Sequence, residues 1–413
     1  MSDVAPAEIA PIEAARRIKT LDVLRGLAIL GILVVNAPFF SAPWQTAINP
    51  TLQPLAIDQT NAWTWFVPHV FFEVKFITLF SLLFGASLFL VGGERSDPER
   101  GKVLRRRLGW MLLFGVIHGA AIWYGDILLV YAVSGLVVMF ARSWRARTLM
   151  MVGGVLYAVL CAFAFLVGAA ISFAPAEVLA EVRTQVWTPE APTLAATIAG
   201  FGGSFAESLS ANFDVWSYFI VHELTNTVPR TIAVMMIGLA LFKWGFFSGN
   251  ARAWVYWLVV VVGAAALAAV AYQAQINYAA GFDFMHMQSR GALLNPALSI
   301  LITLMYASLL ILCVKSGVLG FVTNALAPVG QMAFTNYIAQ SLIMTAIFYG
   351  GRGLGLYGEV NRETLLMIVA GVWAAQLVWS PLWLSKFRMG PLEWVWRRLS
   401  YGKPLAITKA AAA

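Results

Sequence analysis

The chain alternates long apolar runs with short polar segments. The first run, residues 21–39, is long enough to cross a bilayer and begins with an acid and a base, Asp22 and Arg25, one helical turn apart. Further runs follow at 65–91, 108–124, 127–141, 148–172, 230–247, 254–272, 295–314, 330–349 and 364–384. Lipid allows only helices or closed barrels to span it, and these runs are long and do not alternate. We therefore expect an all-α, polytopic membrane protein with about ten transmembrane helices.

Lysine and arginine are distributed unevenly between the two sides that this span count defines. Most of them fall on the side of the N-terminus, whereas the opposite side carries only Arg183, Arg230, Arg290, Arg352 and Arg362 outside the spans. Because cytoplasmic loops are enriched in Lys and Arg, this bias places both termini in the cytoplasm.

The lengths of the polar segments predict the domain organisation. We expect a cytoplasmic tail (1–20), a five-helix membrane bundle (21–172), an extracytoplasmic loop (173–229), a C-terminal five-helix half (230–400) and a second cytoplasmic tail (401–413). The long loop contains an amphipathic tract around residues 205–219. Loops of this length usually have a function or a structure of their own. The tract predicts interfacial helices that re-enter the bundle and cover a cavity.

Composition agrees with a membrane protein, since 60% of the residues are apolar and 12% are charged, against about 25% charged in soluble chains. The net charge of +8 arises from basic residues at many loop ends. Topology and anionic lipid headgroups explain this charge, so we expect membrane lipids and no nucleic acid as partners. Cys161 and Cys313 both fall inside apolar runs, which supports neither a disulfide framework nor a cysteine-based zinc site. Gly- and Ala-rich runs would allow close contacts in a homo-oligomer.

Ionisable residues inside the second and third runs form the first candidate site. His69 and Glu73 are spaced i,i+4 on one helix face, His118 lies at a similar depth in the third run, and Asp126 follows at its mouth. Two imidazoles and a carboxylate are the groups needed for general-base activation of a hydroxyl or an amine. We therefore expect His118, Glu73, His69 and Asp126 to form a catalytic cluster.

Each of these residues also has a structural interpretation. A histidine in a span often serves as a hydrogen-bonded structural group, Glu73 balances the nearby charge of Lys75, and Asp126 suits a turn. Two histidines and a glutamate are a conceivable zinc set, but no His-x-x-x-His or His-Glu-x-x-His spacing is present, so no metal is expected.

Other polar residues are candidates for binding an acceptor substrate. They are His222, Glu223 and Arg230 before the sixth run, with Asn336 and Gln340 in the ninth. Helix capping at the interface explains the first group equally well, and interhelical hydrogen bonds explain the two amides.

Basic residues on the cytoplasmic side form a candidate donor site. Arg105, Arg106 and Arg107 precede the third run, and Arg25 lies one turn inside the first. Guanidinium groups bind phosphates through charge-assisted hydrogen bonds, which suits the phosphates of acyl-CoA. The positive-inside bias alone is the competing explanation.

Several strings resemble the YeiB-type family of bacterial inner-membrane proteins. They are RIKTLDVLRGLAILGILVVN, FFEVKFITLFSLLFGAS, RRRLGWMLLFGVIHGAAIWYGDILLVYA, GQMAFTNYIAQSLIMTAIFYGGRGLGLYG and GPLEWVWRRLSYGK. Through the LDVLRG start, that family is similar to transmembrane acyltransferases of the heparan-α-glucosaminide N-acetyltransferase type. The resemblance implies an inner-membrane location and transfer of an acyl group from cytoplasmic acyl-CoA to an extracytoplasmic acceptor through a membrane-embedded histidine. Asp22, Arg25 and His118 are the residues that carry over.

Three functions are open at this point. The first is a transmembrane acyltransferase that uses acyl-CoA as donor and a sugar, lipid or cell-envelope hydroxyl or amine as acceptor. The second is a transporter of a small solute or lipid, in which buried His and Glu relay protons. The third is a non-catalytic protein that binds lipid or quinone in an aromatic bundle.

Overall fold

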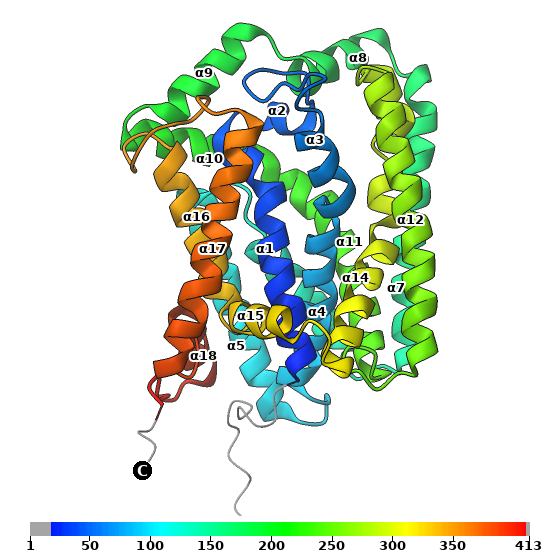
Figure 1. Cartoon of the computed structure of the whole chain (residues 1–413), viewed down its shortest axis with the longest axis vertical. Helices are drawn as coiled ribbons and strands as arrows, with labels where there is room; N and C mark the ends of the chain where they lie inside the picture. Colours follow the sequence, from blue (N-terminus) through cyan, green and yellow to red (C-terminus); the bar gives the residue numbers. More distant parts are fainter. Residues whose placement is uncertain (1–17, 410–413) are drawn as a thin grey trace, which may run out of the picture.

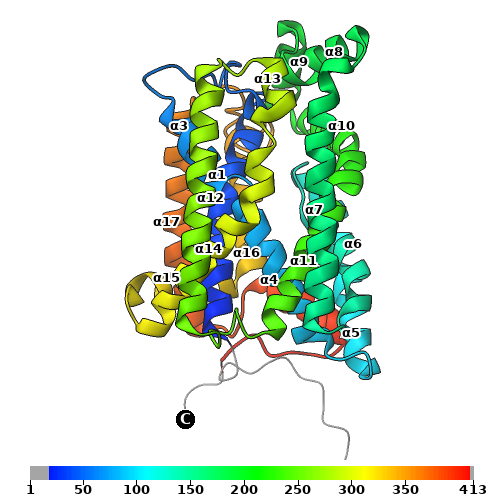
Figure 2. The ribbon, with the colours of Figure 1, turned by 90° about the vertical axis from the view of Figure 1, so that its right-hand side faces the viewer.

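The computed structural model describes residues 18–409 as a bundle of helices arranged along one long axis (Figures 1 and 2). Within these residues, seven helical segments are long and apolar enough to cross a membrane: Lys19–Ser41, Trp63–Gly92, Ala146–Phe173, Phe205–Lys243, Ala253–Ala279, Leu294–Ser316 and Arg362–Lys386. Shorter apolar helices lie at Leu128–Ala141 and Ala333–Phe348. The predicted all-α membrane architecture is confirmed, whereas the count of ten membrane-crossing helices stays a prediction.

The bundle is built from α1 (Lys19–Ser41), α3 (Trp63–Val67), α4 (Lys75–Gly92), α5 (Pro98–Ile117), α6 (Leu128–Val138), α7 (Ala146–Ala170), α10 (Phe205–His222), α11 (Val228–Lys243), α12 (Ala253–Ala279), α14 (Leu294–Ser316), α16 (Ala333–Phe348) and α17 (Arg362–Lys386). Shorter connecting helices are α2 (Trp44–Ile48), α8 (Ala176–Val182), α9 (Ala191–Gly202), α13 (Phe284–His286), α15 (Gly320–Gln331) and α18 (Pro391–Tyr401). Five-residue π-helical turns are η2 (Pro68–Phe72), η3 (His118–Ile122), η6 (Arg183–Trp187), η7 (Glu223–Thr227) and η8 (Met287–Gly291).

Helix α1 lies in the middle of the bundle, with α16 and α17 on one side and α4 and α14 on the other (Figure 1). It also packs closely against α15, which crosses it near one end. A Cβ atom at Gly26 would overlap the backbone of Leu326, and one at Gly330 would overlap the backbone of Asp22. These two glycines therefore permit the close approach of α1 and α15, which fixes the position of the Asp22–Arg25 turn.

The segment predicted as an extracytoplasmic loop is largely helical. Helices α8 and α9 cover one end of the bundle, and α10, η7 and α11 form a nearly continuous helical run (Figures 1 and 2). Helix α10 begins with a capping box in which Ser204 and Glu207 bond reciprocally. The described chain ends, near Ile18 and Lys409, both lie at the opposite end of the bundle (Figure 1). Of the predicted tails, residues 1–17 and 410–413 lie outside the described part of the chain.

A break between η2 and α4 is closed by a buried lysine. Val74 adopts a left-handed conformation (φ 66°), and the Lys75 side chain next to it is fully buried. Lys75 Nζ donates to the carbonyl oxygen of His69 at 3.0 Å and to Asn295 Oδ1 of α14. Because an interrupted helix exposes carbonyl groups, the ammonium group here satisfies an acceptor that lipid could not.

We expect Lys75→Ala to lower the melting temperature of the detergent-solubilised protein. The substitution leaves Asn295 Oδ1 without its lysine donor, at a cost of about 1–3 kcal/mol of unfolding free energy. Lys102→Ala is the control, since Lys102 is exposed and pairs only with Glu99 on α5, a contact worth less than about 1 kcal/mol. Equal losses of stability in the two variants would contradict a capping role for Lys75.

Candidate functional site

A chain of three buried side chains lies at the junction of α5, α6 and α16. His118 Nδ1 is 2.8 Å from Asp126 Oδ1, and His118 Nε2 is 2.9 Å from Ser341 Oγ. His118 begins η3, Asp126 lies in the connection before α6, and Ser341 is on the buried face of α16. His118 and Ser341 are each 1% exposed. Three elements thus bring an acid, an imidazole and a hydroxyl into one line.

The carboxylate of Asp126 is fixed by the start of α6. Its oxygens accept from the backbone N–H of Leu128 at 3.1 Å and of Leu129 at 2.7 Å. These are N–H groups of the first helical turn, which have no partner within the helix. The aspartate for which the sequence also suggested a turn role therefore caps α6 and binds His118.

The hydrogen bonds of His118 assign its tautomer. A carboxylate only accepts, so Nδ1 carries the proton and donates to Asp126. Nε2 is then the acceptor, and it receives the hydroxyl hydrogen of Ser341. An acid that orients an imidazole, whose second nitrogen faces a hydroxyl, is the arrangement used for nucleophile activation in acyl transfer.

Asn212 of α10 holds the π-helical turn that carries His118. Its Nδ2 donates to the carbonyl oxygens of Gly119 and Ala120, and its Oδ1 accepts from the N–H of Tyr124. Because η3 and the extended residue after it leave these backbone groups without helical partners, the amide replaces them. The predicted loop segment therefore supports the candidate site directly.

A cavity of about 240 Å³ opens next to Asp126, and we call it the carboxylate cavity. Its acidic groups are Asp126 and Glu223. Its other lining residues are Ile32, Val35, Asn36, Phe39, Val74, Ile77, Trp123, Tyr124, Gly125, Ile127, Phe219 and Thr227. Glu223 Oε2 and Trp123 Nε1 are buried and have no hydrogen-bond partner within the described residues. Unpaired buried polar atoms in an aromatic cavity suit a polar ligand.

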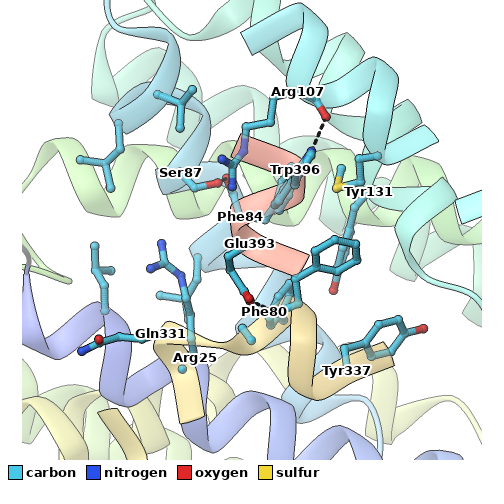
Figure 3. A pocket seen from close by; sticks show the side chains of 18 of the residues that line it. Arg25, Phe80, Phe84, Ser87, Arg107, Tyr131, Gln331, Tyr337, Glu393 and Trp396 are labelled. Atoms are coloured by element: carbon cyan, nitrogen blue, oxygen red, sulfur yellow. Dashed lines mark hydrogen bonds between the residues drawn. The ribbon is translucent and has the colours of Figure 1, made fainter. Parts of the chain in front are cut away.

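A larger cavity of about 680 Å³ lies toward the opposite end of the bundle, and we call it the arginine cavity. Its guanidinium groups are Arg25, Arg100, Arg107 and Arg397. Figure 3 shows Arg25 and Arg107 pointing into the cavity from α1 and α5, with Tyr131 and Tyr337 farther along it. Asp22, Asp97 and Glu393 also line the cavity, so its arginines exceed its acidic residues by one. Guanidinium groups together with aromatic rings suit an anion with an apolar tail.

Helix α18 forms one wall of the arginine cavity. The Arg107 guanidinium stacks 3.6 Å above the Trp396 ring, whose Nε1 donates to the Arg107 carbonyl oxygen. Glu393 accepts from the N–H groups of Phe334 and Thr335 at the start of α16. Burial raises the pKa of the Glu393 carboxyl above its ordinary value, and the hydrogen bonds from Thr335 and Phe334 oppose this rise.

The hydrogen-bonded side chains of Asp126, His118 and Ser341 adjoin residues of both cavities. Ile32 and Ile127 line both of them. Asp126 belongs to the carboxylate cavity, and Tyr337, whose ring centroid is 5.2 Å from that of His118, belongs to the arginine cavity. His118 and Ser341 themselves line neither cavity, and the two cavities come nearest to them at Asp126 and Tyr337.

The structure divides the predicted catalytic cluster into two parts. His69 and Glu73 pair at 2.5 Å, and the His69 ring stacks on Trp65 with the centroids 4.7 Å apart. His118 instead pairs with Asp126 and Ser341. Within the described residues, no hydrogen bond links His69 or Glu73 to His118. The stacking of His69 on Trp65 and the hydrogen bond from Lys75 to the His69 carbonyl oxygen support the structural interpretation of His69 and Glu73.

The predicted donor residues also separate. Arg25, which pairs with Asp22 at 3.3 Å, and Arg107 line the arginine cavity. Arg105 and Arg106 are exposed and do not line it. Arg100 and Arg397 line it as well, although the sequence pattern did not single them out.

Among the predicted acceptor-binding residues, Glu223 lines the carboxylate cavity, and the other four line neither of the two cavities described. His222 is exposed and contacts Asn226. Arg230 bonds to Thr78 of α4 and Ser299 of α14.

The two amides of the ninth run link α16 to its neighbours. Asn336 contacts Ser380, and Gln340 contacts Gln376 and the carbonyl oxygen of Ile29.

Ser341 was not among the predicted site residues. A serine in an apolar helix commonly bonds to its own backbone, so composition carries no signal for it. The one local hint is its neighbourhood, since TNYIAQS concentrates polar residues inside an apolar run. Within the described residues, no three His, Cys, Asp or Glu side chains form a group suited to a metal ion.

Comparison with known proteins identifies relatives that cover nearly the whole chain. It is 33% identical over 401 residues to the "Uncharacterized protein YeiB" of Escherichia coli, covering 92% of this chain and 95% of that protein. It is 31% identical to the "Uncharacterized protein YxaH" of Bacillus subtilis, covering 96% and 97% of the two chains. Residues 241–403 match a family model described as "Protein of unknown function (DUF418)". No solved structure matches the chain.

We expect Asp126→Ala to destabilise the protein and Asp126→Asn to preserve most of its stability. Alanine removes the cap of α6 and the partner of His118, at a cost of about 1–3 kcal/mol. Leu128 and Leu129 bond to different oxygens of Asp126, so asparagine keeps an acceptor for one of the two N–H groups whereas alanine keeps none. Thermal melting in detergent tests this, and an alanine variant as stable as wild type would contradict the capping role.

Proposed function

We propose that this chain, which belongs to the YeiB-type family of membrane proteins, is a transmembrane acyltransferase. It takes an acyl group from cytoplasmic acyl-CoA and delivers it to a hydroxyl or amine on the other side of the bacterial cytoplasmic membrane. The observation that carries the proposal is the buried His118–Asp126 pair beside two cavities, one lined by four arginines and three acidic residues and the other by Asp126 and Glu223.

The arginine cavity is the proposed donor site. Four guanidinium groups suit the phosphates of CoA, and the aromatic inner part suits its apolar arm and acyl chain. The end of the bundle that holds this cavity also holds the basic segments before α5 and in α18, which supports a cytoplasmic orientation under the positive-inside rule.

The carboxylate cavity is the proposed acceptor site. Asp126 and Glu223 accept hydrogen bonds from hydroxyl or ammonium groups, and Trp123, Tyr124 and Phe219 offer ring faces to a sugar or an amine. In this scheme His118 removes a proton during transfer, while Asp126 fixes its tautomer and stabilises the imidazolium. The surrounding apolar helices keep the pair away from bulk water.

The two opposed cavities also suit the transport of a small solute by alternating access. Transport predicts flux across the membrane without acyl-CoA and without release of a thiol. Solute uptake into proteoliposomes, measured with and without acetyl-CoA, separates the two functions.

We expect the purified protein to release free thiol from acetyl-CoA when glucosamine is supplied as an acceptor with an amine and hydroxyls. His118→Ala should lower this rate about 10²–10⁴-fold, the usual contribution of general-base catalysis. His222→Ala is the matched control, because its ring is exposed and lies outside both cavities. Full activity in His118→Ala would refute the assignment of the base.

We expect Arg107→Gln to raise the KM for acetyl-CoA about 10- to 100-fold, since a charge-assisted hydrogen bond contributes about 1.5–3 kcal/mol. Arg105→Gln is the control from the same helix, because Arg105 is exposed and does not line the cavity. Melting temperatures of both variants separate ligand binding from the loss of stacking on Trp396. Similar KM values in both variants would rule out the arginine cavity as the donor site.

A further inference from the structure

We propose that Ser341 is the nucleophile of this site and carries the acyl group as an ester between the two half-reactions. This inference rests on the proposed acyltransferase function and makes it more specific. Direct transfer would need the donor and the acceptor at His118 together, whereas an acyl-serine intermediate lets them react one after the other.

The two nitrogens of His118 are both occupied by side chains of the protein. Nδ1 donates to Asp126 at 2.8 Å, and Nε2 accepts from Ser341 at 2.9 Å. An acceptor substrate would have to displace Ser341 before His118 could take its proton. His118 is therefore placed to take the hydroxyl proton of Ser341 before that of an acceptor.

The surroundings of Ser341 favour an activated hydroxyl. Its other contact, with the carbonyl oxygen of Tyr337, is longer at 3.4 Å, so the bond to His118 is the better one. The serine is 1% exposed, and a buried carboxylate–imidazole pair acts more strongly in such a low-dielectric setting.

Helix α16 holds Ser341 in a fixed register. One residue before it, Gln340 bonds to the carbonyl oxygen of Ile29 on α1 and to Gln376 on α17. One turn earlier, Asn336 bonds to Ser380 and accepts from Trp379. These amides form the interhelical hydrogen bonds that the sequence analysis left open as their alternative role. They anchor the helix that presents the serine, which is the preorganisation that nucleophilic catalysis needs.

Tyr337 connects Ser341 to the arginine cavity. It lies one turn before Ser341 on α16 and lines that cavity (Figure 3). Its hydroxyl oxygen accepts from the N–H of Ile127 at 3.4 Å, which leaves its own proton to donate. A thioester carbonyl that enters from this cavity would find a hydroxyl donor for its oxygen beside the nucleophile.

In the first half-reaction, Ser341 Oγ attacks the carbonyl carbon of the thioester and its proton moves to His118 Nε2. The carbon–sulfur bond breaks, and the sulfur leaves as a thiol with the proton from His118. In the second, an acceptor from the carboxylate cavity gives its proton to His118 and attacks the ester carbon. The bond to Oγ then breaks, and Ser341 regains its proton.

The test uses the full-length protein in detergent with acetyl-CoA labelled in the acetyl group and no acceptor. We expect the wild type to retain one acetyl group per chain after denaturation, at the peptide that contains Ser341. Ser341→Ala should lose the label and release thiol more than about 1,000-fold more slowly. Ser341→Cys should keep a label that hydroxylamine removes more readily, as expected of a thioester.

Thr345→Ala is the matched control, because Thr345 is a buried hydroxyl residue one turn farther along α16 whose oxygen bonds only to the carbonyl of Leu342. It should label like the wild type. Thiol release by Ser341→Ala at the wild-type rate, with the wild type unlabelled, would overturn the acyl-serine and leave the acyltransferase function standing. A wild type that neither binds nor cleaves acetyl-CoA or a long-chain acyl-CoA would instead overturn the proposed function itself.

Discussion

The hydrogen bond between Asp126 and His118 is the interaction on which the arrangement of the site depends. One carboxylate caps α6, holds the imidazole at the end of α5 and, through that imidazole, meets Ser341 of α16. Removing it would leave both backbone N–H groups and the Nδ1 of His118 without partners where water is scarce. The same carboxylate thus stabilises the fold and organises the chemistry proposed for it.

A second constraint is that lipid offers no hydrogen bonds to an interrupted helix. At three places where a helix of this bundle breaks or ends, a polar side chain from another element satisfies the exposed backbone. Lys75 does so after η2, Asn212 does so at η3, and Arg100 bonds to the carbonyl oxygens that end α4. π-helical turns of this kind recur at functional sites, and His69, His118 and Glu223 each lie in one. Breaks therefore bring polar groups to the interior.

The residues of the arginine cavity illustrate what a sequence pattern can and cannot resolve. Three consecutive arginines are equivalent as a motif, yet successive residues point about 100° apart around a helix. Only Arg107 of the three faces the cavity, where it stacks on Trp396 of α18, an element far away in the chain. The pattern predicted a basic site at this end of the bundle, and the orientation of α5 selected its members.

The membrane-spanning class, the approximate helices and the basic end of the bundle follow from the sequence alone, which grouped His118 with acidic residues without indicating which of them it binds. These features follow from local quantities, namely the length of apolar runs and the spacing of charges along them. The packing of the helices, in contrast, separates His69 and Glu73 from His118 and brings Ser341, 223 residues away in the chain, into hydrogen-bond contact with it. Which helix faces meet depends on the packing of the whole bundle, because apolar surfaces attract without specifying a partner.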